Sequence, residues 1–169
     1  MVKIMSKLLF LKEYFKFCEF EIHDDWLYII NPGNQRKIYV DYEYYEYYLD
    51  QQGNKVFDAT ERYTFRFETQ HQHFENKEML IKCIEDYISE KVVAIEFYED
   101  GKNRFGGEID ATTSVNVTPH TLASCFGYSV SRLIELDFEM KSWNGEYDAS
   151  GKIQKVDGEY IILKRLAER

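Results

Sequence analysis

Two stretches of the chain repeat their apolar residues every three or four positions, as expected for one face of an α-helix. The first follows Ser6 and the second follows Asn76, and both residue types are common helix N-caps. A third, shorter helix is predicted after Thr118, because Pro119 suits the first helical position and Gly127 suits the helix end. The apolar positions are Leu8, Leu11, Tyr14, Phe15 and Cys18 in the first helix, and Leu80, Cys83, Ile84, Tyr87 and Ile88 in the second.

Most of the remaining chain alternates apolar and polar residues, which is the pattern of strands with one buried face. Turn sequences separate neighbouring strands, and strands joined by short turns pair antiparallel. The chain is therefore predicted to be an α+β domain, with two main helices and one short helix packed on a β-rich antiparallel sheet. The strands are expected within residues 26–30, 36–42, 63–67, 93–97, 104–110, 134–141 and 160–163, with turns at 31–34, 51–54, 99–101 and 157–158.

The size and composition of the chain favour a single domain spanning residues 1–169. Its 169 residues are 44% hydrophobic, which is ample for a core, and its two prolines mark no linker. The longest apolar run near the N-terminus, LLFL, is too short for a signal peptide or a membrane span. Cys18, Cys83 and Cys125 are scattered among apolar neighbours, which indicates buried, reduced thiols and a cytoplasmic location.

Residues 39–50, YVDYEYYEYYLD, hold six tyrosines and four carboxylates without a basic residue. Tyr39, Asp41 and Glu43 alternate with the apolar side of this strand, so we expect them on its other face. The alternation slips near Tyr44-Tyr45, which predicts a β-bulge. A surface of carboxylates and phenols offers acceptors to Lys and Arg and flat rings on which guanidinium groups stack.

The net charge of −9 is concentrated in the middle of the chain. Residues 38–110 hold seventeen acidic and eight basic residues, whereas the flanking regions are nearly balanced. A negative field of this kind repels nucleic acid and steers a basic partner. The same composition also serves solubility alone, and this alternative stays open.

Chemistry-bearing residues elsewhere allow competing interpretations. Carboxylates around the predicted 93–110 hairpin, chiefly Glu96, Glu108 and Asp110, suit a metal-dependent hydrolase. His71 and His73 lie on one side of an extended segment, but no third metal ligand is evident nearby, so neither a metal nor a cofactor is predicted. Trp143 suits either an interface anchor or the edge of a core.

The candidate partner-binding surface combines the tyrosine-rich strand with the 96–110 region. We expect this surface to bind a protein, and we expect no nucleic acid or membrane partner. A small-ligand-binding domain with an aromatic pocket is a further alternative. The predicted contact residues are Tyr39, Asp41, Glu43, Tyr45, Glu46, Tyr47, Asp50, Glu96, Glu99, Asp100 and Trp143.

The size, the charge placement and three segments, YVDYEYYEYY, VVAIEFYEDGK and MKSWNGEYDASGKI, give this chain a resemblance to bacterial immunity proteins. Such proteins are paired with the toxins of polymorphic or contact-dependent growth inhibition systems. The resemblance implies a cytosolic inhibitor without catalytic residues or cofactors. Its partner would be a toxin domain, often a basic nuclease, whose active cleft it occludes.

Overall fold

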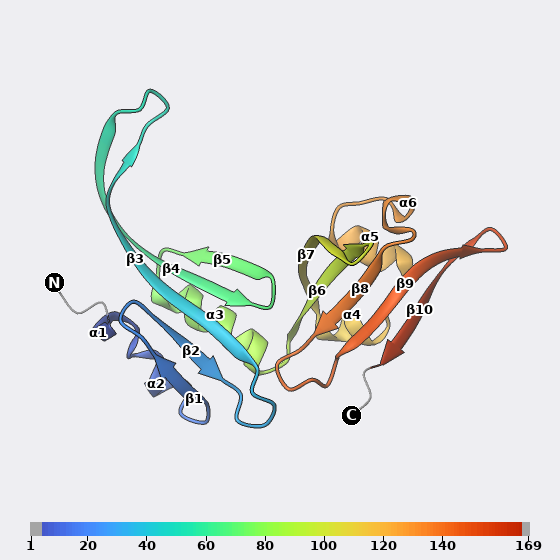
Figure 1. Cartoon of the computed structure of the whole chain (residues 1–169), viewed down its shortest axis with the longest axis horizontal. Helices are drawn as coiled ribbons and strands as arrows, with labels where there is room; N and C mark the ends of the chain where they lie inside the picture. Colours follow the sequence, from blue (N-terminus) through green and yellow to red (C-terminus); the bar gives the residue numbers. More distant parts are fainter. Residues whose placement is uncertain (1–4, 167–169) are drawn as a thin grey trace. The chain divides into compact units, whose positions relative to one another are not determined.

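A computed structural model gives the fold of the chain (Figure 1). It describes the backbone of residues 5–166, and the side chains in this range except those of residues 5, 6, 45–48, 57–60, 165 and 166. The predicted α+β class is confirmed, with strands arranged in two antiparallel five-stranded sheets instead of one. Two compact units contain these sheets: residues 1–67 with 71–85, and residues 68–70 with 86–169. The assignment of the whole chain to one domain stays a prediction.

The sheet of the first unit is a simple meander in which every strand pairs with its neighbours in sequence. Short turns connect the strands, and the turn predicted at residues 31–34 joins β2 to β3. The strands are β1 (Glu19–Ile22), β2 (Trp26–Ile30), β3 (Lys37–Leu49), β4 (Lys55–Phe67) and β5 (Gln70–Phe74).

Helices α1 (Met5–Leu8), α2 (Leu11–Tyr14) and α3 (Lys77–Ile88) supply the helical side of the first core. The prediction of α3 is confirmed, and Asn76 caps it by accepting a hydrogen bond from the Met79 amide at 2.9 Å. The predicted first helix is instead two short helices, and Phe10, at the break between them, packs edge-on against Tyr63. Of the predicted apolar positions, Leu8, Leu11 and Phe15 are buried, whereas Tyr14 is exposed.

Strands β3 and β4 extend well beyond the rest of their sheet (Figure 1). Strand β2 pairs only with residues 37–41 of β3, and the five residues of β5 reach only the end of β4. From Glu43↔Arg62 to Leu49↔Lys55, the described pairing of these strands is therefore with each other. The register shifts between Tyr45 and Tyr47, which confirms the predicted bulge. We call residues 43–61 the ribbon.

The sheet of the second unit has the order β10-β9-β8-β6-β7. The strand predicted over 134–141 begins only at Asp137, because Glu135 has a positive φ of 69° and so interrupts the extended chain; residues 130–133 form a helix. The strands are β6 (Val92–Glu99), β7 (Lys102–Asp110), β8 (Asp137–Lys141), β9 (Ala149–Val156) and β10 (Glu159–Leu166), and the helices are α4 (Ala111–Val115), α5 (Pro119–Cys125) and α6 (Val130–Leu133).

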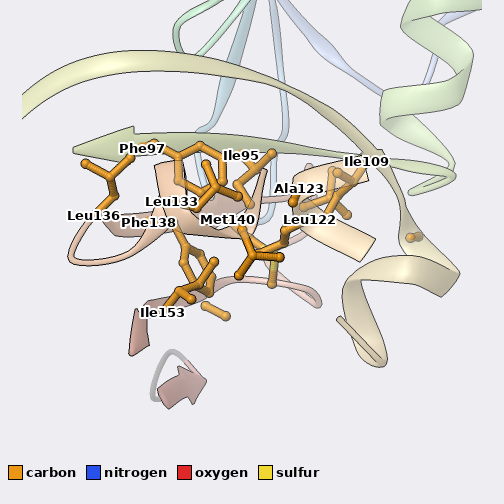
Figure 2. Packing of buried hydrophobic residues seen from close by; sticks show 14 residues of the cluster. Ile95, Phe97, Ile109, Leu122, Ala123, Leu133, Leu136, Phe138, Met140 and Ile153 are labelled. Carbon is orange, nitrogen blue, oxygen red and sulfur yellow. The ribbon is translucent and has the colours of Figure 1, made fainter. Parts of the chain in front are cut away.

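The second core lies between this sheet and its helices. Figure 2 shows Ile95, Phe97, Phe138 and Met140 of the strands meeting Leu122, Ala123 and Leu133 of the helices. The predicted start of helix α5 is confirmed, because Thr118 and Thr121 form a reciprocal capping box around Pro119.

The expectation of three buried thiols is wrong. Cys125 is exposed, because α5 ends there and already buries Leu122 and Ala123, while Cys18 and Cys83 are half-buried. Burial raises the pKa of the Cys18 thiol to about 11, so this thiol stays protonated near neutral pH.

Candidate functional site

One face of the first sheet is left without a helical layer among the described residues of its unit. The helices lie on the other face, where Phe10 meets Tyr63 and the Cys83 thiol lies 3.9 Å from Gln72 Oε1. Because side chains alternate along a strand, the residues between these buried positions point the opposite way. This outer face comprises Glu19 and Glu21 of β1, Trp26 and Tyr28 of β2, Lys37, Tyr39, Asp41 and Glu43 of β3, Arg62, Thr64 and Arg66 of β4, and His71 and His73 of β5.

Three half-buried aromatic rings occupy the middle of the outer face. The ring centroids of Trp26 and Tyr28 are 5.1 Å apart, those of Trp26 and Tyr39 are 5.5 Å apart, and those of Tyr28 and Tyr39 are 5.8 Å apart. His23 stacks on Trp26 with a centroid separation of 3.6 Å. Clusters of Trp and Tyr are typical of the energetically dominant part of a protein interface.

Cations lie over these rings. Lys37 Nζ is 4.7 Å from the centre of the Tyr28 ring and 2.8 Å from Glu21 Oε2. The Arg66 guanidinium is 5.4 Å from the centre of the Tyr39 ring. Both contacts fall within the range of cation–π attraction. The outer face is thus aromatic at its centre and carries both signs of charge around it.

Tyr39 and Asp41 form a coupled pair within the cluster. Burial raises the pKa of the Asp41 carboxyl and the neighbouring Glu43 adds to this, although a hydrogen bond from Tyr39 opposes it. Burial, followed by the charge of Asp41, raises the pKa of Tyr39 to about 12. Tyr39 therefore remains a hydrogen-bond donor throughout the physiological pH range.

The base of the ribbon is tied to the first helix through Glu61. Its carboxylate accepts hydrogen bonds from Lys7 Nζ at 2.7 Å, from the Tyr42 hydroxyl at 3.2 Å and from the Tyr63 hydroxyl at 3.4 Å. The hydrogen bond from Lys7 is the main cause that lowers the pKa of Glu61.

The predicted contact residues of the first unit fall at two places. Tyr39, Asp41 and Glu43 share the outer face. Asp50 lies at the ribbon turn, where its carboxylate accepts hydrogen bonds from the amides of Gln52 and Asn54 and shapes the predicted turn. The side chains of Tyr45, Glu46 and Tyr47 lie outside the described residues.

Two predicted contact residues of the second unit are corrected, because the fold buries them. Glu96 is only 5% exposed, and its carboxylate accepts hydrogen bonds from the Thr69 amide, the Tyr98 hydroxyl and Asn103 Nδ2. Trp143 is 2% exposed and belongs to the interior. Neither side chain is available to a partner in this fold.

Glu99 and Asp100 are exposed at the β6–β7 turn, as expected for contact residues. Glu99 forms an ion pair with Arg104, and Asp100 has a positive φ of 51° that suits its turn position. Tyr39 and Glu99 belong to different compact units, so the predicted surface is divided between two bodies.

The carboxylates proposed for hydrolysis have separate structural roles. Glu108 accepts a hydrogen bond from the Tyr87 hydroxyl at 2.7 Å, and Asp110 caps α4 by accepting from the Thr112 amide at 2.8 Å. In the described part of the chain, no three His, Cys, Asp or Glu side chains are grouped so as to hold a metal ion. His71 and His73 form a pair, with His73 Nδ1 3.0 Å from Thr64 Oγ1.

A hollow of about 880 Å³ lies on the second sheet. Its lining includes the Tyr98 ring, the carboxylates of Asp137 and Glu139, Ser150 and Leu163. This lining is mixed, with few aromatic rings, so the alternative of an aromatic ligand pocket gains no support from it.

Comparisons with protein-family models, characterised proteins and solved structures find no match to this chain. Over the described residues, the helices lack the length and apolar character required to cross a bilayer.

Proposed function

We propose that this chain is a cytosolic inhibitor of the immunity-protein class, which binds and occludes a cationic toxin domain through the ribbon. The observation that carries the proposal is the extension of β3 and β4 beyond the support of their sheet. A two-stranded ribbon is marginally stable by itself, so a long one is favoured where a partner packs on it. Its sequence holds five acidic residues and one lysine.

Occlusion requires no catalytic group. The ribbon carboxylates pair with the Lys and Arg side chains that a nuclease uses to hold phosphates, and the tyrosine rings stack on guanidinium groups. Tyr44 and Leu49, which are 52% and 61% exposed, add apolar contact area. Since charge complementarity acts mainly on encounter, we expect the association rate to fall steeply with added salt.

The first test shortens the ribbon. Tyr44 and Glu61 are paired across the strands, so replacing residues 45–60 with Asn-Gly creates a two-residue hairpin between them. Each variant is co-expressed with the toxin domain that a pull-down with the full chain recovers from the native cell. The full chain is expected to restore growth and the shortened chain to fail, although circular dichroism shows it folded. Protection by the shortened chain, or none by the full chain, would contradict the proposal.

The second test separates charge from shape. Neutralising Glu43, Glu46 and Asp58 together to Gln, Gln and Asn should slow association with that domain at least about tenfold at low salt. The matched control neutralises three carboxylates of the second unit, Glu135, Asp137 and Glu139. Equal slowing by both triple variants would show that net charge, not the ribbon, drives binding.

A further inference from the structure

Charge changes sign across the outer face of the first sheet. Glu19 and Glu21 lie on β1 at one edge, whereas Arg62 and Arg66 lie on β4, next to the imidazoles of β5 at the other edge. Neighbouring strands are about 4.8 Å apart, so about 19 Å separates β1 from β5. The aromatic cluster lies between them, on β2 and β3.

The side chains form a defined row across the sheet. Pairing places Glu21 beside Tyr28, Tyr28 beside Tyr39, and Tyr39 beside Arg66. His73 contacts Thr64, so on an antiparallel neighbour His71 lies beside Arg66. The row therefore runs from a carboxylate, through two phenols, to a guanidinium and an imidazole.

We infer that the outer face docks on a second copy of this chain, turned over about a two-fold axis that runs parallel to the strands through β3. This rotation places β1 over the β5 of the copy and β2 over its β4. Glu21 then faces the second His71, Tyr28 faces the second Arg66, and the two Tyr39 rings meet at the axis. Such an isologous interface is self-complementary, and sheets pack face to face in this way at about 10 Å.

Other occupants fit this face less well. A nucleic acid strand would bring phosphates against Glu19, Glu21, Asp41 and Glu43, which repel them. A uniformly cationic protein would meet Arg62 and Arg66 on the same surface, and an axis perpendicular to the strands would place acid on acid. A copy related by the two-fold axis parallel to the strands places the acidic edge of each sheet over the basic edge of the other. The cost of this arrangement lies on β3 itself, where Lys37, Asp41 and Glu43 each come near their own copy.

The test measures self-association of the full chain by sedimentation equilibrium, from micromolar to several hundred micromolar protein. The wild type is expected to dimerise. Glu21→Lys places a cation beside the second Arg66 and removes the carboxylate opposite the second His71, whereas His71→Glu places a carboxylate opposite Glu21. Each should weaken the dimer at least about tenfold. Combining them should restore the dissociation constant to within about threefold of the wild type. Within one chain these residues lie on opposite edge strands, so only a second copy can produce the rescue.

Tyr39→Ser removes the ring that meets its own copy at the axis, so it should weaken the dimer independently of the charged pairs. Thermal unfolding of this variant checks that it is folded. The ribbon-shortened chain keeps the outer face and should dimerise normally, so this inference and the proposed function can fail separately. A wild type that stays monomeric, or a double variant as weak as its parents, overturns the inference. Binding of a labelled single-stranded oligonucleotide that Tyr39→Ser abolishes would assign the face to nucleic acid instead.

Discussion

The Glu96 carboxylate lies inside the second unit and is held by three donors: the Thr69 amide, the Tyr98 hydroxyl and the Asn103 amide group. Burial by itself raises the pKa of this carboxyl, but the hydrogen bonds outweigh burial and lower the pKa below its usual value. A buried charge that is well paired costs little, whereas removing it leaves its donors without an acceptor. Glu96 therefore joins residues 68–70 to the sheet.

Replacing Glu96 with alanine should lower the free energy of unfolding by about 1–3 kcal/mol, because buried donors lose their acceptor. Urea denaturation near neutral pH measures this difference. The control is Glu99→Ala, which removes an exposed ion pair and should change stability by less than about 1 kcal/mol.

The contribution of Glu96 should also depend on pH. Its folded pKa is lowered, so the stabilisation is complete above the unfolded pKa and is lost as pH falls through the folded pKa. The stability gap between wild type and variant should therefore narrow in acid. A gap that is absent at neutral pH, or as small as for Glu99→Ala, would show that Glu96 is not structurally important.

At the scale of elements, the Phe138 ring of β8 packs directly against the backbone of Gly151 in β9. Phe138 pairs with Gly151, and a Cβ added to Gly151 would lie 2.5 Å from Phe138 Cζ and 2.6 Å from the Leu163 carbonyl oxygen. The carbonyl belongs to the neighbouring strand β10 and cannot move without disturbing strand pairing. Only glycine leaves room for the Phe138 ring, which belongs to the core shown in Figure 2.

Gly151→Ala is expected to destabilise the chain by about 1–3 kcal/mol through overpacking. Denaturant unfolding monitored by fluorescence gives the value. Ser150→Ala, one residue earlier and exposed, should have an effect within about 0.5 kcal/mol. Should the two variants unfold at the same denaturant concentration, the close contact at Gly151 does not limit the packing.

At the scale of the whole molecule, the charge is shared unequally by two compact units. The second unit holds sixteen acidic and ten basic residues, and the first holds fourteen and eleven. Each unit has its own sheet and its own helical cover. In the first unit, the outer face carries nearly balanced charge, whereas the ribbon is strongly acidic. The two surfaces therefore suit different partners.

Self-association should strengthen as pH falls from about 7.5 to about 5.5, where imidazoles gain a proton. In the single chain, burial lowers the pKa of His73, the charges of Arg62, His71 and Arg66 lower it further, and Glu43 raises it. In the proposed dimer Glu21 of the copy faces His71, so a protonated His71 gains an ion pair that the neutral ring lacks, and the dimer binds more protons than the monomers do.

The measurement is the dimer dissociation constant across this pH range. A chain with His71→Gln and His73→Gln should lose most of the pH dependence while still dimerising. If the wild type shows the same dissociation constant at both pH values, the imidazoles do not face carboxylates, and the proposed axis is wrong.

Local patterns in the sequence specify the individual helices, strands and turns of this protein. The alternation of apolar and polar residues predicts most strands, and the apolar spacing after Asn76 predicts α3. The break in this alternation near Tyr44-Tyr45 predicts the bulge. Trp26 and Tyr28 also alternate with buried residues, a signal that could have placed them beside Tyr39. Such features depend on neighbours in the chain, which is why a pattern reveals them.

The pairing and packing of these elements follow from the folded structure. It divided the strands between two sheets, buried Glu96 and Trp143, and set Glu21 and His71 at opposite edges of one face. The exposure of a side chain and the charge of a surface depend on contacts between residues far apart in sequence. A sequence pattern does not specify those contacts, because the same alternation is compatible with several strand orders and with several arrangements of the helices on the sheets.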